Sequence, residues 1–543
     1  MRCTNVHLTS TNPMVNDYLT EFSRLEEFYT YNPNQPESFA VRYDRLIGQF
    51  RGDREVVTAV LKDFNQTIGA GPKTFHNIEL LSGPDAAVVV TGQQAGILGG
   101  PLYTIYKAIT AIQLAAKLTR ELNKPVVPVF WIASEDHDFL EINHFNVWNR
   151  EGEPVKLKLG FEPAGKISVG DIAVPPEVES LLAGLEAEIQ DSEFKLANLQ
   201  FLSASAQASN NLAEWFGRII CNWLGDSGLI FIDPMHSQLR KQERRIFGIA
   251  LEKFSEINRS LRDAGEKLKA KGYPVMVDKE QDSVNLFVYH AGQRLALTSD
   301  GATYNTRDGV FSMSREEILR MAEETPESFS PNVMLRPLTQ ETILPTLAYV
   351  GGPGEISYWG QFKEIFQLFG MEMPIVFPRA NLTVVEAGIE NYLSKYDFSL
   401  EDVLYNAEGV KSRYLESLDQ VGIERVFETL NADIARAYAG VGETLAMIDP
   451  SLKELTKDNQ IRISSQVDWL KGKALQAHRK ANETFIRQFK KICNSLAPEG
   501  KPQERYISGI NFLVKYGPQF FQELAELDLI SNTEHKVVYL KTT

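Results

Sequence analysis

The sequence predicts an α/β fold with a doubly wound parallel core, inserted segments and a long antiparallel helical arm. Three observations support this prediction. Continuous apolar runs have the length of buried strands, a stretch with helical periodicity separates the first two runs, and two heptad-patterned segments near the C-terminus flank a proline. Continuous apolar strands with intervening helices are typical of a parallel sheet that is buried on both faces.

The first two apolar runs predict a strand, a loop, a helix and a second strand. Residues 86–90 (AAVVV) predict a buried strand, and the glycine-rich segment TGQQAGILGGP follows it. Apolar residues at helical intervals then predict a helix over residues 102–118, and residues 125–132 (PVVPVFWI) predict the next strand. This order is that of a βαβ unit.

Two later runs extend this core. GLIFID at residues 228–233 and MPIVF at residues 373–377 predict a third and a fourth strand. The segment 152–204 is mixed and acidic, and the segment 273–308 alternates in a way that predicts short antiparallel strands. We interpret both segments as insertions into the core.

The predicted organisation follows from these assignments. Its parts are a first part of the core (1–150), a first insertion (151–205), a second part of the core (206–270), a small β-rich second insertion (271–325), a third part of the core (326–390), the helical arm (391–500) and a C-terminal segment that packs on arm and core (501–543).

The arm is predicted by apolar residues that recur with heptad spacing. A break at Asp449, Pro450 and Ser451 separates two such series, so two long helices should run antiparallel. The alternative is two ordinary helices packed on the core. The two series are Phe427, Leu430, Ile434, Ala437, Val441 and Ile448, and then Ile463, Val467, Leu470, Ala474, Ala477 and Ala481. An arm with an exposed apolar stripe favours a homodimer.

Length and composition restrict the class of protein. A chain of 543 residues is too long for one hydrophobic core, and 43% hydrophobic with 23% charged residues is usual for a folded globular protein. A net charge of -15 argues against a broad surface for nucleic acid or for an anionic membrane. We therefore expect a multidomain enzyme with neither nucleic acid nor a membrane as its partner.

The cysteines and the N-terminus indicate the compartment. Cys3, Cys221 and Cys493 are far apart and have no CxxC or Cys/His spacing, so we expect free thiols in a reducing compartment and no zinc site. The N-terminus has no apolar signal core, and no run of about 18 apolar residues could span a bilayer. We expect a cytoplasmic protein.

The glycine-rich loop after the first strand is a candidate anion site. Its glycines let backbone amides approach a carboxylate or a phosphate. The spacing matches neither GxxxxGK[ST] nor GxGxxG, so a simple tight turn is the alternative. The candidate binding residues of this loop and the following helix are Gln93, Gln94, Gly96, Gly99, Tyr103, Tyr106 and Lys107.

The loop after the second strand predicts the catalytic residues. It places Glu135, Asp136, His137 and Asp138 directly after a buried strand, where charged groups are costly unless they are used. A carboxylate beside a histidine can set its tautomer, so we predict His137 as a general base oriented by Asp136 or Asp138. The alternatives are Mg²⁺ bound by the carboxylates and a capping network at a helix start.

A third region, from residue 332 to residue 379, adds candidate substrate or phosphate ligands. Glu355 could hold an ammonium group, and Arg336 or Arg379 could bind a carboxylate through two hydrogen bonds. The alternative for either arginine is a structural ion pair. The candidates of this region are Arg336, Gly352, Gly354, Glu355, Tyr358, Trp359 and Arg379.

Four segments resemble the bacillithiol-biosynthesis cysteine-adding enzyme family, BshC. They are GQQAGILGGPLYTIYK, PVFWIASEDHDFLEIN, NVMLRPLTQETILPTLAYVGGPGEISYWG and PQERYISGINFLVKYGPQF, and the resemblance covers nearly the whole chain. It implies a Rossmann-like core similar to class I aminoacyl-tRNA synthetases, connecting-peptide insertions and a coiled-coil arm used in dimerisation. It also implies the addition of cysteine to glucosaminyl malate by amide formation, the last step of bacillithiol biosynthesis.

The analogy with synthetases implies that ATP with Mg²⁺ activates the cysteine carboxylate. The sequence contains no HIGH or KMSKS motif at the corresponding places, so another activated cysteine donor is the alternative. In this hypothesis Lys107, Arg336 and the two glycine loops hold anionic groups, while His137 deprotonates the attacking amine. Arg505 and Tyr516, in the last of the four segments, either form a second ligand pocket or pack the arm.

Other functions stay open at the level of sequence. One is a ligase that acts on a different amino-sugar substrate, and another is a synthetase-like dimeric ligand-binding or scaffold protein. The titratable loop 135–138 favours an enzyme over a scaffold. The acidic balance and the absence of basic, aromatic-rich segments disfavour a tRNA-directed enzyme.

Overall fold

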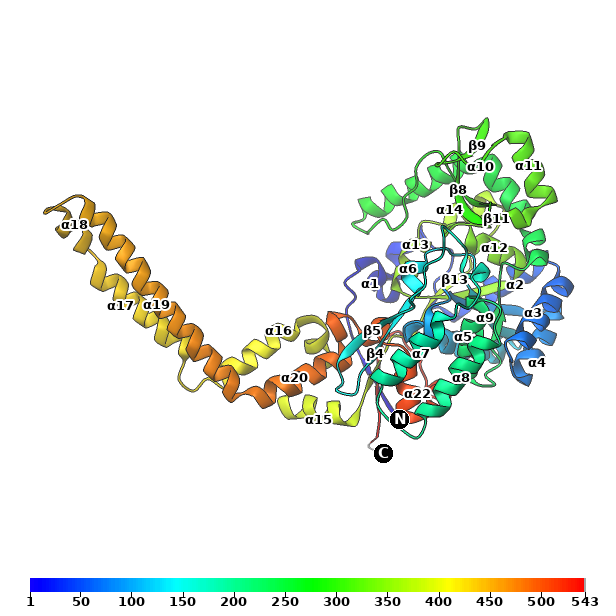
Figure 1. The fold of residues 1–543 in the computed structure, drawn as a ribbon. Helices are drawn as coiled ribbons and strands as arrows, with labels where there is room; N and C mark the ends of the chain where they lie inside the picture. Colours follow the sequence, from blue (N-terminus) through cyan, green and yellow to red (C-terminus); the bar gives the residue numbers. More distant parts are fainter. Residues whose placement is uncertain (542–543) are drawn as a thin grey trace. The chain divides into compact units, whose positions relative to one another are not determined.

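The structure is a computed structural model that describes residues 1–541 and divides into two units (Figure 1). The first unit contains residues 1–384 and 503–541, and the second contains residues 385–502. Among residues 1–541, no helix combines the length and the apolarity needed to cross a membrane.

The core of the first unit is a parallel sheet with the strand order β13-β12-β2-β3-β6. Val90 of β2 lies opposite Val129 of β3 on one side and Tyr349 of β12 on the other. Successive residues of β2 face opposite ways, with Val88 in one apolar cluster and Val89 in another, so both faces are buried. The strands are β2 (Ala87–Gln93), β3 (Val126–Ile132), β6 (Ile230–Ile232), β12 (Thr346–Gly351) and β13 (Ile375–Pro378).

The predicted fold class is confirmed, and all four predicted core strands are present. The prediction is incomplete in one respect, because the sheet has a fifth strand, β12, between β13 and β2. Residues 346–351 are apolar, but they run directly into the glycine-rich segment that follows. The sequence interpretation therefore includes them in a binding loop and misses a central strand.

Helices cover both faces of this sheet. After β2, α5 packs on β2, β3 and β12, while α3 and α4 pack against β6 and α2 packs against β12 and β13. The helix α5 is followed by Asn123, its C-terminal cap, which adopts the left-handed conformation that asparagine tolerates. The helices of the core are α1 (Pro13–Thr20), α2 (Pro36–Gln49), α3 (Arg54–Thr67), α4 (Pro72–Ser82), α5 (Tyr103–Leu122), α9 (Leu212–Leu224), α10 (Ser237–Ala270), α12 (Arg336–Ile343), α13 (Pro353–Trp359) and α14 (Lys363–Leu368).

Two insertions interrupt the order of core strands. The first contains α6 (Phe139–Ile142), the hairpin of β4 (His144–Trp148) and β5 (Pro154–Lys158), α7 (Glu177–Glu188) and α8 (Lys195–Gln207). The second is an antiparallel sheet with the order β10-β9-β8-β7-β11. Its elements are β7 (Ser283–His290), β8 (Gln293–Ser299), β9 (Thr303–Thr306), β10 (Ser312–Ser314), α11 (Arg315–Glu324) and β11 (Phe329–Pro331). The alternating segment 273–308 predicts β7, β8 and β9 correctly, whereas β10 and β11 lie beyond it.

The C-terminal segment returns to the first unit. Its last strand, β15 (His535–Tyr539), pairs with β1 (Arg2–Val6), and the three-stranded sheet is completed by β14 (Leu382–Val385). The helices of this segment are α21 (Gln503–Tyr506), α22 (Ile510–Tyr516) and α23 (Phe520–Ala525).

The second unit is helical and contains the predicted antiparallel arm. Figure 1 shows α17 and α19 side by side, with α18 at the tip of this hairpin. Gly440, at φ +80°, separates α17 from α18, so the first predicted helix is broken earlier than the sequence indicates. The helices are α15 (Ala387–Tyr396), α16 (Leu400–Ser417), α17 (Ile423–Tyr438), α18 (Val441–Ala446), α19 (Ser451–Ala481) and α20 (Glu483–Leu496).

The apolar stripes of the arm are only partly buried within one chain. Ile423 and Phe427 of α17 pack against Val467 of α19. By contrast, Ile448 of the first heptad series and Leu470 of the second are 78% and 50% exposed. The coiled-coil prediction is confirmed, and apolar surface remains along the hairpin.

Candidate active site

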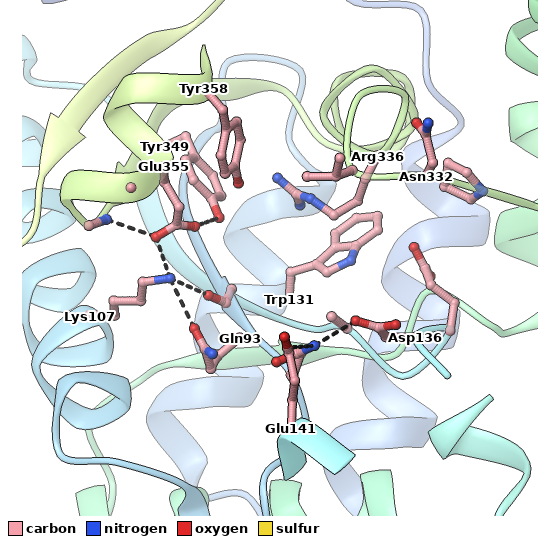
Figure 2. A pocket seen from close by; sticks show the side chains of 18 of the residues that line it. Gln93, Lys107, Trp131, Asp136, Glu141, Asn332, Arg336, Tyr349, Glu355 and Tyr358 are labelled. Atoms are coloured by element: carbon pink, nitrogen blue, oxygen red, sulfur yellow. Dashed lines mark hydrogen bonds and ion pairs between the residues drawn. The ribbon is translucent and has the colours of Figure 1, made fainter. Parts of the chain in front are cut away.

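A cavity of about 590 Å³ lies at the carboxyl ends of the central strands (Figure 2). The loops after β2, β3, β12 and β13 line it, together with β7 and β8 of the second insertion. The edge of the sheet where parallel strands end is where open α/β folds bind their ligands. The three loop regions predicted from the sequence therefore meet at one place.

Lys107 is buried beside this cavity with every ammonium hydrogen in use. Its Nζ lies 2.5 Å from Glu355 Oε2 and donates to the Gly92 carbonyl at 2.9 Å and to Gln93 Oε1 at 3.1 Å. Burial lowers the pKa of Lys107, and the Glu355 carboxylate opposes that shift. An ammonium group has three donors, so none is left for a ligand. The structure thus pairs Lys107 with protein groups, and its predicted role in holding an anion stays a prediction.

Glu355 is saturated in the same way. In addition to Lys107, it accepts hydrogen bonds from Gly352 N at 2.8 Å and from the Tyr349 hydroxyl at 2.5 Å, as Figure 2 shows. Burial alone would raise the pKa of Glu355, but Lys107 and these donors hold it below its ordinary value. The predicted ammonium partner of Glu355 is thus Lys107 itself. The pair ties the ends of β2 and β12 to α5.

The Glu135 carboxylate belongs to a buried network of ion pairs. Its Oε2 accepts from Arg240 Nη2 at 2.9 Å, and Arg240 Nη1 donates to Glu243 at 2.6 Å. Burial raises the pKa of Glu243 to about 7, against the effect of Arg240. Glu135 reaches the cavity wall, but its carboxylate pairs with Arg240 of α10 and anchors the loop there, and its catalytic role stays a prediction.

Asp136 and Glu141 form an acidic side of the cavity. The Gln94 amide donates to Asp136 Oδ2 at 2.6 Å and to Glu141 Oε2 at 2.9 Å, which bridges the two carboxylates (Figure 2). Asp136 Oδ1 accepts from the backbone N–H groups of His137 and Asp138 at 2.7 and 3.2 Å. Asp138 is exposed and does not line the cavity.

His137 lines the cavity, but its orientation differs from the prediction. Its Nδ1 lies 2.9 Å from Nη1 of Arg294, a residue of β8. Burial lowers the pKa of His137, and the charge of Arg294 lowers it further, against the opposing effect of Asp136. The expected orientation by Asp136 or Asp138 is therefore wrong.

The two candidate arginines have different surroundings. Arg336 donates to Gln340 Oε1 at 3.0 Å and lies over the rings of Tyr349 and Trp131 at 5.1 and 5.7 Å, and within residues 1–541 its buried Nη2 has no hydrogen-bond partner. Arg379 also lines the cavity, but Glu504 binds it through two hydrogen bonds of 2.9 and 2.6 Å. Arg336 is available to an anionic ligand, whereas Arg379 closes a structural ion pair.

The remaining candidates, which are glutamines, glycines and aromatic residues, differ in whether they line the cavity. Those that line the cavity are Gln93, Gln94, Tyr103, Gly352, Gly354 and Tyr358, while Gly99, Tyr106 and Trp359 are buried in the core and Gly96 is half-buried. A Cβ on Gly99, at φ +76°, would lie 2.7 Å from Trp223, so packing and backbone conformation both require glycine there. Gly99 therefore faces the core and not the cavity, and an anion role for the second half of this loop stays a prediction.

The last two candidates do not share a pocket. Arg505 lines the main cavity, whereas Tyr516 stacks on Phe512 and Phe520 at centroid distances of 6.4 and 5.6 Å. The prediction of a second pocket formed by these two residues is therefore wrong. Tyr516 instead packs on aromatic residues of the C-terminal segment in the first unit, so its packing does not show the predicted alternative of a contact with the arm.

Several cavity residues are missed by the sequence interpretation. Asn332, Tyr349 and Glu141 lie inside the motifs quoted above, so proximity to those motifs could have identified them. Arg294 and Phe287 come from the second insertion, and its alternating pattern contains no sign that this strand pair faces the cavity. Across residues 1–541, no three His, Cys, Asp or Glu side chains are grouped so that they could hold a metal ion.

Comparison with known proteins identifies one family over nearly the whole chain. The model described as "Bacillithiol biosynthesis BshC, N-terminal Rossmann-like domain" matches residues 1–380, and the model described as "Bacillithiol biosynthesis BshC, C-terminal coiled-coil domain" matches residues 382–540. A Desulforamulus reducens protein named "Putative cysteine ligase BshC" is 37% identical over 540 residues, which are 99% of this chain and 100% of that protein.

Two further comparisons extend this result. A protein of the same name from Symbiobacterium thermophilum is 36% identical over 96% of this chain and 97% of its own. A crystal structure described as "putative arginyl t-RNA synthetase" from Campylobacter jejuni is 12% identical and covers 81% of this chain and 99% of that chain. Its TM-score of 0.23 is too low to support a conclusion about fold or function.

Proposed function

The chain belongs to the bacillithiol biosynthesis BshC family, and from this membership we propose that it is a ligase that joins L-cysteine to glucosaminyl malate through an amide bond. The observation that carries the proposal is the division of charge in the cavity. Figure 2 shows Arg336 above the Trp131 ring and the carboxylates of Asp136 and Glu141 below it. Both substrates have an amine and at least one carboxylate, which such a cavity can hold at opposite ends.

We include ATP with Mg²⁺ as the activating co-substrate. A cysteine carboxylate oxygen attacks the α-phosphorus of ATP, pyrophosphate leaves, and an acyl adenylate forms. The glucosamine nitrogen then attacks the carbonyl carbon, so that the C–N bond forms, the bond to AMP breaks, and the nitrogen loses a proton to a carboxylate of the cavity. Arg336, with its unpartnered Nη2, is placed to bind an anionic group during these steps.

The test is mass spectrometry of the purified full chain incubated with cysteine, glucosaminyl malate, ATP and Mg²⁺, with each component omitted in turn. We expect the amide product and AMP only in the complete mixture. A further mixture replaces cysteine and ATP by a cysteine thioester, and product formed only there would replace the adenylate by another activated donor. Cysteine-dependent AMP without the product would indicate a different amino sugar. If every mixture lacks both product and AMP, the ligase proposal is refuted and a scaffold role is favoured.

We also propose that two copies of the chain pair through the arm. Leu470 is 50% exposed on α19, and Ile448 is 78% exposed at the end of the same hairpin. A second copy would remove this apolar surface from water. Sedimentation velocity should therefore give about twice the chain mass of 61.1 kDa at micromolar concentration. Leu470→Glu should shift the protein to the monomer mass, because a charge cannot be buried without a partner.

The matched control for the arm is Lys480→Glu on the same helix, where the side chain is exposed. This variant should keep the dimer mass. A monomeric wild-type protein, or a Leu470→Glu variant that stays dimeric, would contradict pairing through this surface.

A further inference from the structure

Arg294 is held rigidly at the cavity by the second insertion. The side chain is 4% exposed, its Nε donates to Ser330 Oγ at 2.8 Å, and its Nη2 donates to the Pro331 carbonyl at 2.8 Å. The guanidinium also lies 3.7 Å from the centroid of the Phe287 ring. These contacts leave Nη1 directed at Nδ1 of His137, 2.9 Å away. The geometry of this pair is therefore set by Arg294.

The contact determines which nitrogen of His137 carries the proton. A guanidinium stays protonated and can only donate, so Nδ1 of His137 must accept through its lone pair. The single proton of the neutral ring is then on Nε2. Asp136 cannot restore the other tautomer, because its Oδ1 is occupied by the backbone N–H groups of His137 and Asp138.

The charged groups around the ring also favour its neutral form. Arg294 on β8 and Lys166 in the first insertion oppose a positive charge, while Asp136 and Asp138 on the same loop favour one. Burial and Arg294 outweigh the two carboxylates, so the pKa of His137 is below its ordinary value. In this neutral form the ring has one donor, at Nε2.

We propose that Arg294 is a positioning residue that fixes His137 as the Nε2–H tautomer, so that the imidazole donates a hydrogen bond to a substrate oxygen and does not act as the base. The inference rests on the proposed ligase function. When the amine attacks the activated carbonyl carbon, the carbonyl electron pair moves to its oxygen, and a neutral imidazole donor stabilises that charge. The proton of the attacking nitrogen goes to the acidic pair of Asp136 and Glu141, and AMP leaves with the electrons of the broken C–O bond.

The direct test is the tautomer itself, which needs no substrate. Full-length protein labelled with ¹⁵N-histidine contains eight histidines, and the signals of His137 are assigned by their absence in His137→Gln. Long-range ¹H–¹⁵N spectra at pH 8, above the ordinary histidine pKa of about 6.5, should show a protonated Nε2 and an unprotonated Nδ1. A proton on Nδ1, or an imidazolium at this pH, would overturn the proposal.

Arg294→Gln tests the cause of the tautomer. The variant should give a mixture of the two tautomers and a higher pKa for His137, because the obligatory donor and its charge are gone. The matched control is Arg307→Gln in the same insertion, where the arginine is exposed and pairs with Glu280. If Arg294→Gln does not fold, the wild-type spectrum still decides. An unchanged spectrum in a folded Arg294→Gln variant would show that Arg294 is not the cause.

Measurements of ligase activity distinguish whether His137 acts as a hydrogen-bond donor or as a base. Glutamine can accept from Arg294 and donate to a substrate, but it cannot remove a proton. We expect His137→Ala to lower kcat by about 10²–10³-fold and His137→Gln to lower it by about tenfold or less. Equal losses in both variants would refute the donor role. If the wild type makes no amide product while the predicted tautomer is observed, the proposed function fails and the positioning by Arg294 stands.

Discussion

Lys107→Met is expected to lower the free energy of unfolding of the first unit by about 3–5 kcal/mol, because it leaves Glu355 as a buried charge without its partner. The side chains of Lys107 and Glu355 are 4% and 17% exposed, and their charged atoms lie 2.5 Å apart. Chemical denaturation followed by tryptophan fluorescence would measure the loss, since Trp131 and Trp359 are buried in the first unit.

A second substitution identifies the mechanism of this loss. Adding Glu355→Gln to Lys107→Met should recover about half of the lost stability, because the amide has no charge and can still accept from Tyr349 or Gly352. Lys117→Met is the matched control on the same helix. Lys117 is 40% exposed, and its ammonium lies as far as 4.0 Å from the Glu121 carboxylate. The loss of this weak surface ion pair should lower the free energy of unfolding by less than about 0.5 kcal/mol. A double variant as unstable as the single one would contradict the argument.

The same pair predicts a dependence on pH. Because the pKa of Glu355 is held below its ordinary value, this carboxylate contributes stability above the unfolded pKa of about 4.3, and the contribution is lost as the pH falls through the lowered value. In Lys107→Met, burial should raise the pKa of Glu355, and protonation removes the unpaired charge. The difference in stability between wild type and variant should therefore narrow as the pH falls from 7 toward 4.

Much of the fold follows from local sequence patterns. Buried parallel strands are short continuous apolar runs, so β2, β3, β6 and β13 can be identified without knowledge of their partners. The strand β12 is missed because its apolar run merges with a glycine-rich loop. The heptad pattern predicts the hairpin of α17 and α19, but the break at Gly440 depends on a left-handed backbone that the pattern does not reveal.

The roles within the site could not be predicted to the same degree. A sequence shows that Lys107, Glu355 and His137 lie near strand ends, but it does not show which hydrogen-bond partners they find. The third hydrogen bond of the Lys107 ammonium depends on Glu355, which follows Lys107 by 248 residues along the chain. The orientation of His137 depends on Arg294, from an insertion whose alternating pattern is the same whichever side faces the cavity.

Arg336 and Arg379 show most clearly that a sequence does not reveal which partners a side chain finds. Both are single arginines near glycine-rich loops, and both line the cavity. Arg336→Ala should lower kcat/KM for the ligase reaction by about 10²–10³-fold, the value of a charge-assisted contact of about 3–4 kcal/mol. The free energy of unfolding of this variant should change by less than about 1.5 kcal/mol, because Arg336 contacts Gln340 and two aromatic rings and forms no ion pair with a carboxylate of residues 1–541.

Arg379→Met should show the opposite pattern. It leaves Glu504 buried without its two hydrogen bonds from the guanidinium, so the free energy of unfolding should fall by about 3–5 kcal/mol. Arg336→Lys is the conservative control, and it should restore part of kcat/KM because it keeps the charge but not the paired donors. If Arg336→Ala kept full activity, or if it unfolded the protein as Arg379→Met should, then the unpartnered Nη2 of Arg336 would not be the ligand contact. A loss confined to kcat/KM would place an anionic group of the substrate against Arg336, because only a bound anion makes its paired donors matter.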